Sequence, residues 1–345
     1  MRAAIALAAV GCLVLAACGR AAAPAASSSS AAATAPAVSK PAASAPVASK
    51  GTALNVGYTT NGLVNTPLWV AKERGFFQQN GLDVTLKSLV ANAELPALIS
   101  GELQYDGSGA AGVVAADLEG GNVVLIAAAS DYPIYSLFAN KKYTSVQDLA
   151  GQTIGVTALG STGEAVARLF LRHYKLEDKV KIAAAGGSSE SIMAAMTSGG
   201  LAGGVLVPPT TGLALDQGFV ELVNGVKLGV PMNHSGIEVT RDYLKAHPAE
   251  VRSFLKAYLQ AWTYAADPAN KPEMLKIIGQ YGKVDAHFSE LGYEMIVPVW
   301  QGKKVPTIDP QSVANVLMFL NNPKAKTAQP SEFIDNSLME EVARS

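Results

Sequence analysis

The stretch Thr66–Gly75, TPLWVAKERG, lies between two short apolar runs and decides how the chain should fold. Thr66 and Pro67 are typical of a helix start and Gly75 of a helix end, so the sequence predicts a helix over 68–74. The runs on either side, Leu54–Tyr58 and Asp83–Leu89, have the length and composition of buried strands. A strand, a helix and a second strand in this order indicate two parallel strands joined by a helical crossover.

The alternation of strands and helices continues to about residue 207, and the pattern then changes. Further strands are predicted at 104–108, 123–129, 153–157, 180–184 and 205–207. After about residue 240 helices dominate, and the first of them is long and amphipathic. Its apolar side chains are Val251, Phe254, Leu255, Tyr258, Leu259 and Trp262. The whole pattern predicts an α/β fold of mostly parallel sheets flanked by helices.

Size and charge limit the number of domains and the kinds of partner. A chain of 345 residues, 49% of them hydrophobic, is long enough for two lobes with ordinary cores. The formal net charge is −1 and the basic residues are scattered, so the chain lacks the basic patch that binds a phosphate backbone. We therefore expect no nucleic-acid partner.

The first 17 residues have the composition of a secretory signal, with Arg2 followed by the apolar run Ala3–Ala17. This run is shorter than the roughly 20 apolar residues of a membrane-spanning helix, although an uncleaved membrane helix remains the alternative. The run ends in Leu15-Ala-Ala-Cys18, which looks like a bacterial lipobox and fits better than the site at Cys12. We expect cleavage before Cys18, lipidation of Cys18, and a cell-envelope lipoprotein held to the membrane by that anchor.

Two consequences follow from a signal peptide at 1–17. Cys18 would be the one cysteine of the mature chain, which excludes an internal disulfide, a cysteine zinc site and a cysteine nucleophile. Residues 19–50 are almost entirely Ala, Ser and Pro, so residues 18–50 are predicted to be a disordered, lipidated tether.

Five predicted strands or strand–helix junctions end in small, often hydroxyl-bearing residues. Ligands of open parallel sheets bind outside the carboxyl ends of the strands, so five such turns predict a cleft lined by hydroxyls and amides. The turns are Thr59–Gly62, Ser108–Gly112, Gly160–Gly163, Gly186–Ser189 and Pro208–Thr211.

The turn at Gly160–Gly163 has two interpretations. Gly155 and Gly160 have the glycine spacing of a phosphate-binding loop, but no Lys follows to balance phosphate charge, so nucleotide binding is not expected. Ser161 and Glu164 fit a capping box instead, in which the Ser hydroxyl accepts from a helix amide and Glu164 reaches back to the Ser amide. A helix start can also hold an anion, so capping and ligand binding are compatible.

Other candidate residues are fewer. Trp69 and Tyr132 are possible cleft aromatics, as is Tyr135, with core packing as the alternative for Trp69. Asp131 and Glu238 could meet in space, but ordinary polar or hinge roles are the alternative. Among the motifs sought, the chain has no HExxH or GxSxG sequence, and its four histidines lack metal-ligand spacing, so we expect no catalytic residue, metal or cofactor.

Three segments carry a resemblance to a known family: Thr66–Phe77 with Gly81–Val84, then Leu149–Val156, and finally Arg241–Pro248. They resemble the solute-binding proteins of ABC importers for nitrate, alkanesulfonates, taurine, thiamine pyrimidine precursors and riboflavin, and the likeness runs from about residue 54 to 320. It implies a two-lobed type II periplasmic-binding fold that closes on a small molecule. It also places ligands at Thr60 and Asn61, at Ser108 and Gly109, and at Gly160–Thr162.

The sequence and the resemblance together predict the organisation of the protein. The first lobe comprises 51–140 and 235–345, and the second comprises 141–234. The expected ligand-binding residues are Thr60, Asn61, Trp69, Ser108, Gly109, Tyr132, Gly160, Ser161, Thr162, Ser188, Pro209 and Thr210.

The expected function is that of an exported, monomeric receptor. It would deliver a small polar or aromatic solute, anionic or heterocyclic (of the sulfonate, nitrate, pyrimidine or flavin type), to the permease and ATPase subunits of an ABC importer. A sensory or assembly module and an enzyme that uses the same cleft are the alternatives.

Overall fold

The computed structural model describes residues 51–345 except 60–61, 91–92 and 321. The predicted signal peptide, Cys18 and the predicted tether lie outside the described residues, as do Thr60 and Asn61. Within the described part of the chain, no helix is long and apolar enough to cross a membrane.

The first crossover forms as the stretch Thr66–Gly75 predicts. Strand β1 (Thr52–Thr59) pairs in parallel with β2 (Leu82–Leu89), and helices α1 (Thr66–Glu73) and α2 (Phe76–Gln79) connect them. Gly75 separates the two helices with φ +70°, a left-handed conformation that glycine adopts without steric cost. The predicted helix and its end are confirmed.

A second pair of strands lies beside this crossover. Strand β3 (Val123–Ser130) pairs antiparallel with β9 (Ser235–Thr240). The strand predicted at 104–108 is reduced to two single-residue bridges, in which Tyr105 pairs with Val56 and Asp106 pairs with Glu238. These bridges connect β1 to β9. We call the part of the chain that carries β1, β2, β3 and β9 the first lobe.

The second lobe is built on a five-stranded sheet with the order β6-β5-β7-β4-β8. Strand β5 runs parallel to β6 and β7, as predicted, whereas β4 is antiparallel to both β7 and β8. The prediction did not include β4, β8 and β9, which supply the antiparallel pairs. The strands are β4 (Ser136–Ala139), β5 (Thr153–Val156), β6 (Lys181–Ala184), β7 (Gly203–Leu206) and β8 (Val220–Asn224).

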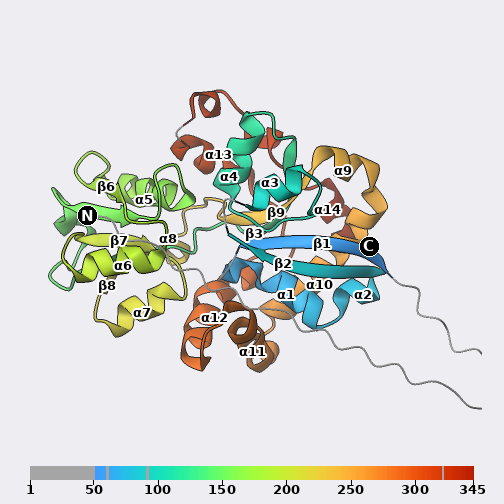
Figure 1. The fold of residues 1–345 in the computed structure, drawn as a ribbon, viewed down its shortest axis with the longest axis horizontal. Helices are drawn as coiled ribbons and strands as arrows, with labels where there is room; N and C mark the ends of the chain where they lie inside the picture. Colours follow the sequence, from blue (N-terminus) through green and yellow to red (C-terminus); the bar gives the residue numbers. More distant parts are fainter. Residues whose placement is uncertain (1–50, 60–61, 91–92, 321) are drawn as a thin grey trace, which may run out of the picture. The chain divides into compact units, whose positions relative to one another are not determined.

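Helices cover both faces of the five-stranded sheet. Ile154 of β5 packs in one core cluster with Phe170 of α5 (Thr162–His173), whereas Gly155 faces α6 (Ser189–Thr197) on the other side. A Cβ at Gly204 would lie 2.2 Å from Ile192 of α6, so glycine lets α6 lie against the sheet. Helix α7 (Thr210–Asp216) packs near β4 and β8. Figure 1 shows strands β6, β7 and β8 of this sheet with the helices α5, α6 and α7 around them.

The C-terminal part of the chain is helical, as predicted. Helix α10 (Pro248–Ala266) buries five of its six predicted apolar positions, and Leu259 is half-buried. It packs against α1 and α14 (Ser337–Arg344) in the first lobe. The other helices of this part are α9 (Arg241–Ala246), α11 (Lys271–Gly282), α12 (Ala286–Gln301) and α13 (Pro310–Phe319).

Shorter elements complete the described chain. They are α3 (Glu94–Ile99), α4 (Ala110–Leu118), α8 (Gly225–Leu228) and 3-10 turns at Leu63–Asn65, Val146–Leu149, Pro268–Asn270, Pro323–Lys326 and Pro330–Glu332.

The chain passes between the lobes twice, once between β3 and β4 and once between β8 and β9. Since β4 belongs to the five-stranded sheet, the strand pairing favours a first crossing between residues 130 and 136 rather than the predicted boundary at 140. The lobe boundaries otherwise stay a prediction.

Candidate functional site

A cavity of about 490 Å³ lies where the ends of the strands in the two lobes meet. This volume is within the range of about 300 to 1,000 Å³ that is usual for small-molecule sites. The first lobe contributes residues that follow β1 and β2, the start of α4, and residues that precede β9. The second lobe contributes the segments that follow β5, β6 and β7. The cavity therefore forms at the strand ends, where the sequence predicts it.

Four helices begin at the cavity: α4, α5, α6 and α7. Their N-cap residues are Gly109, Ser161, Ser188 and Pro209, and all four line the cavity. The first amides of a helix carry a partial positive charge and lack partners within the helix. Side chains cap only two of these helices: Ser161 Oγ accepts from the Glu164 amide at 3.3 Å, and Ser188 Oγ accepts from the Ser191 amide at 3.2 Å.

Ser161 caps the start of α5 as predicted, whereas Glu164 binds a different amide from the one predicted. The Glu164 carboxylate accepts from the amide of Gly160 at 2.5 Å, rather than from the Ser161 amide. Its other oxygen accepts from Arg168 at 2.7 Å and 3.0 Å. Glu164 and Arg168 are therefore occupied with each other at the edge of the site.

The structure brings six of the predicted ligand-binding residues together around the cavity. Four other predicted residues do not line it, namely Trp69, Ser108, Tyr132 and Gly160. Thr60 and Asn61 lie outside the described residues. The six that line it are Gly109, Ser161, Thr162, Ser188, Pro209 and Thr210.

Trp69 belongs to the core of the first lobe, which corrects the prediction that it faces the cleft. Its side chain is 0% exposed, and its ring stacks on Tyr281 with 5.2 Å between the ring centroids. Tyr58 contacts it edge-on at 5.7 Å. A large ring in the first turn of α1 removes most apolar surface from water when it packs inward, which favours the core position.

Ser108 lies one layer behind the cavity and supports its wall. It is 3% exposed; its amide donates to Glu238 Oε1 at 2.8 Å, and its hydroxyl donates to the same oxygen. Its carbonyl accepts from Ser235 Oγ at 2.6 Å, and Ser235 lines the cavity. Ser108 therefore fixes the positions of Gly109 and Ser235.

Glu238 is one of three carboxyl groups buried behind the first lobe's wall, together with Glu94 and Asp106. Burial raises the pKa of Glu94 to about 8, with a further contribution from the charge of Asp106, while the Thr59 hydroxyl lowers it. Burial also raises the pKa of Asp106 to about 6. The pKa of Glu238 lies well above its ordinary value, because of burial and the charge of Asp106. Burial therefore works against ionisation of all three carboxyls.

These three carboxyls do not form a metal centre. In residues 51–345, the gaps aside, no group of three or more His, Cys, Asp or Glu side chains could hold a metal ion. Glu94 Oε1 and Glu238 Oε2 are buried and have no hydrogen-bond partner. Protonation is how such groups avoid burying several charges together.

Tyr135 and His234 line the cavity where the chain crosses between the lobes. Their ring centroids lie 5.0 Å apart. Burial raises the pKa of Tyr135 to about 12 and lowers the pKa of His234 to about 4, so both side chains are uncharged at neutral pH. Tyr135 is one of the two crossing tyrosines that the sequence singled out. Tyr132 is tied to Ser130 instead, since its amide donates to Ser130 Oγ at 3.1 Å and its carbonyl accepts from that hydroxyl.

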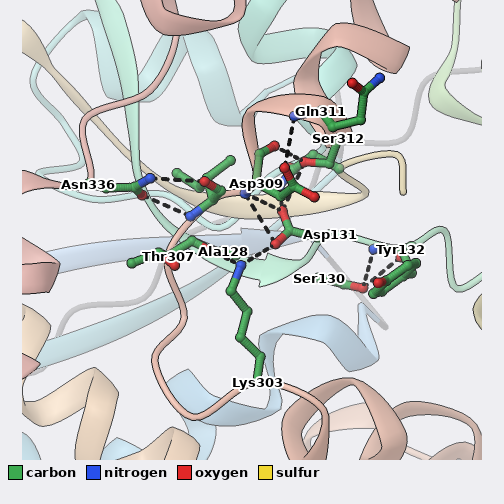
Figure 2. A network of polar contacts seen from close by, with 12 residues as sticks. Ala128, Ser130, Asp131, Tyr132, Lys303, Thr307, Asp309, Gln311, Ser312 and Asn336 are labelled. Carbon is green, nitrogen blue, oxygen red and sulfur yellow. Dashed lines mark hydrogen bonds and ion pairs between the residues drawn. The ribbon is translucent and has the colours of Figure 1, made fainter. Parts of the chain in front are cut away.

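Asp131 joins both crossings to the C-terminal helices. Its carboxylate accepts from Lys303 Nζ at 2.6 Å, from Ser312 Oγ at 2.9 Å and from Asn233 Nδ2 at 3.0 Å. Figure 2 shows Lys303, Asp309 and Ser312 gathered around this carboxylate. Asp131 and Asn233 lie on different crossings, so a single buried carboxylate ties the two together. Asp131 and Glu238 do not share a site.

Several lining residues escaped sequence reasoning. Leu63, Val64, Leu89, Val90 and Ile134 give the first lobe's wall an apolar surface, and Glu190 adds a charge to the second lobe's wall. The apolar residues gave no signal because they resemble core positions. Glu190 could have been found, because it directly follows the predicted turn Gly186–Ser189.

Comparisons with known proteins agree with this geometry. A family model described as NMT1/THI5 like matches residues 64–271. No curated protein has a sequence that matches this chain.

Solved structures share the fold at low sequence identity. The periplasmic aliphatic sulphonate-binding protein SsuA from Escherichia coli is 17% identical over 78% of this chain and 85% of its own, with a TM-score of 0.63. The periplasmic nitrate-binding protein NrtA from Synechocystis PCC 6803 is 14% identical over 86% and 89%, with a TM-score of 0.64. The ligand-binding component of an ABC-type import system from Staphylococcus aureus, with zinc bound, is 14% identical over 85% and 100%, with a TM-score of 0.68. The predicted two-lobed periplasmic-binding fold is confirmed.

Proposed function

Because the chain belongs to the NMT1/THI5-like family, we propose that it is the extracytoplasmic solute-binding component of an ABC importer. The observation that carries this proposal is the cavity of about 490 Å³ between the two lobes, lined by six of the residues that the strand-end turns predict. A cavity shared by two lobes can take up a solute when the lobes close, and the closed form is then presented to a permease.

The lining supports a solute with an apolar body and a polar edge. The first lobe lines the cavity with Leu63, Leu89 and Val90, and the second lobe lines it with the hydroxyl-bearing Thr157, Thr162 and Ser188. Of the expected solute types, the heterocyclic ones fit such a lining better than nitrate, which has no apolar body. The solute would be held by hydroxyls and helix amides rather than by a resident cofactor.

The sequence supports a membrane anchor for this receptor. We propose that Cys18 carries the lipid and that the residues up to 50 form the tether. Changing Cys18 to Ala should move the protein from the membrane fraction to the soluble extracytoplasmic fraction. Mass spectrometry should no longer detect the lipid adduct. A protein that stays with the membrane after this change would contradict the anchor and leave the receptor role untouched.

A thermal-shift screen tests the receptor role. Sulfonates, nitrate, carboxylates, pyrimidines, flavins and organic amines are each added to the purified exported protein. A true solute at a hundredfold excess over its Kd should stabilise the folded state by about 2.7 kcal/mol. Mass spectrometry of a co-purified ligand gives an independent identification. A panel of this breadth with no stabilising member, together with no co-purified ligand, would count against a transport receptor.

A matched pair of variants shows whether a stabilising solute occupies this cavity. Ser188→Ala removes a lining hydroxyl at the start of α6, and Ser198→Ala removes a hydroxyl at the other end of the same helix. The first change should weaken binding several-fold, since a typical lost hydrogen bond is worth about 1 kcal/mol, and the second should leave the affinity unchanged. Equal affinities in both variants would place the solute elsewhere.

A further inference from the structure

The charge carried by the lining of the cavity is negative. In the described part of the chain, no Lys or Arg lines the cavity, and Glu190 is the one charged side chain that does. His234 also lines it but is neutral at ordinary pH, since burial lowers its pKa to about 4. An anionic solute would therefore meet helix amides but no full positive charge.

Glu190 is available to a solute. It lies in the first turn of α6 and is exposed. Its Oε1 accepts from Thr210 Oγ1 at 3.0 Å, and in the described residues no basic side chain pairs with it. Burial works to raise its pKa, but hydrogen bonds from its own amide and from Ser188 and Thr210 outweigh burial and lower it. The carboxylate is thus ionised at neutral pH, held by these hydrogen bonds and without a counter-charge.

The opposite wall supplies no positive charge that could balance Glu190. Glu94, Asp106 and Glu238 lie behind this wall, where Thr59 and Gly109 line the cavity. The Thr59 hydroxyl acts on Glu94, and Ser108, next to Gly109, donates to Glu238. Any charge that these carboxyls retain is negative, and the low dielectric of their surroundings screens it less than water would.

Two basic side chains of this region are already paired. Arg168, one helical turn beyond Glu164, forms its ion pair with that residue at 2.7 Å. Lys303, at the crossings between the lobes, is held by Asp131 at 2.6 Å. Neither cation lines the cavity, so neither offsets Glu190 there.

We propose that the solute is an organic cation, a molecule with an apolar body that presents an ammonium or amidinium group to Glu190. The apolar side chains of the first lobe would cover the body, and the hydroxyls of the second lobe would accept the remaining N–H donors. This inference rests on the proposed receptor function and deepens it, because it replaces the expected anion by a solute of the opposite charge.

Three probes of one shape and different charge test the inference: benzamidine, benzamide and benzoate. They are measured by calorimetry on the exported protein at pH 7, beside a panel of aliphatic and aromatic amines and the sulfonate and nitrate anions. Cations should bind, and benzamidine should exceed benzamide and benzoate by at least about tenfold, the effect of one uncompensated charge contact. A sulfonate, nitrate or carboxylate that binds as tightly as the best cation overturns the inference but leaves the receptor function standing.

Glu190→Gln provides the second arm, with Glu340→Gln as its control. Both are exposed glutamates in the first turn of a helix, but Glu340 lies on α14 and does not line the cavity. Glu190→Gln should weaken the best cation at least tenfold and strengthen binding of the matching anion, whereas Glu340→Gln should change neither. Cation affinity that survives Glu190→Gln overturns the inference. A protein that no probe stabilises contradicts the receptor function itself, and this inference with it.

Discussion

The two walls of the cavity use their polar groups in opposite ways. The first lobe presents apolar side chains such as Leu63 and Val90, and keeps its carboxyls Glu94, Asp106 and Glu238 buried behind them. The second lobe presents hydroxyls and the carboxylate of Glu190 directly to the cavity. The first wall can therefore cover an apolar body while the second orients a polar group, and each wall can be altered without the other.

The largest effect is expected in the core that supports the first wall. Trp69→Ala should lower the free energy of unfolding by about 3 to 5 kcal/mol, the usual loss for a fully buried large aromatic. Because Trp69 does not line the cavity, the affinity of the folded protein for its solute should not change. Denaturant unfolding and calorimetry on the folded fraction measure the two quantities. A large loss of affinity at unchanged stability would contradict this prediction and show that Trp69 takes part in binding.

Trp69 also shows what the sequence could predict. Periodicity and helix signals gave the α1 crossover, the parallel pairs of β5 and the long helix α10, because each depends on residues close together in the chain. Which side of a helix faces the core and which faces a cleft depends on elements that pack later. The sequence therefore left both possibilities open for Trp69.

The candidate site was predicted where it depends on backbone geometry and missed where it depends on distant partners. Small residues after strands gave Gly109, Ser161, Ser188 and Thr210, since the topology gathers strand ends at one place. The hydrogen bond from Lys303 to Asp131 joins residues 172 apart, and the bond from Ser108 to Glu238 joins residues 130 apart. A local sequence pattern cannot predict contacts between residues so far apart in the chain.

The carboxylate of Asp131 connects the two crossings between the lobes. Asp131→Ala removes the acceptor for Asn233 and Ser312, both buried, and for Lys303, whose side chain is 32% exposed. The change leaves Asn233 as a buried donor without a partner, which is costly, whereas Ser312 can still donate to the Asp309 carbonyl and water can reach Lys303. We expect a loss of about 3 kcal/mol of unfolding free energy.

Thermal or denaturant unfolding measures this loss. The exposed Asp242 of α9 supplies the control, and Asp242→Ala should change stability by at most about 0.5 kcal/mol. Equal stability in both variants would mean that the carboxylate does not hold the crossings together.

The hidden carboxyls of the first wall predict a dependence on pH. The pKa of Glu94 is about 8 in the folded protein, against 4.5 for the unperturbed group. Between these values the folded state binds more protons than the unfolded state, so stability should fall as pH rises from about 5 to 8. Glu94→Gln removes this proton and should make the fall shallower by about 3 kcal/mol.

Urea unfolding at pH 5, 6, 7 and 8 compares the two proteins. Glu102→Gln, at an exposed position that pairs with Lys87, serves as the control and should keep the slope of the wild type. If the stability of the wild type and of Glu94→Gln fell equally between pH 5 and 8, Glu94 would not be the group that binds the extra proton in the folded state. Asp106 or Glu238 would then have to bind it.

The smallest effect on stability should come from the second wall, and it separates capping from binding. Ser161→Ala with Thr162→Ala removes the N-cap hydroxyl of α5, which costs about 1 kcal/mol of unfolding free energy. Both side chains line the cavity, so a solute that bonds to them should lose more binding free energy than the fold loses stability, a fall in affinity of about tenfold or more. Ser188→Ala alone, at the N-cap of α6, should cost similar stability and a smaller share of the affinity. If the double change lowers stability by about 1 kcal/mol while calorimetry finds the affinity intact, the start of α5 is a helix cap and nothing more, and the polar edge of the solute must be held by α6 and α7.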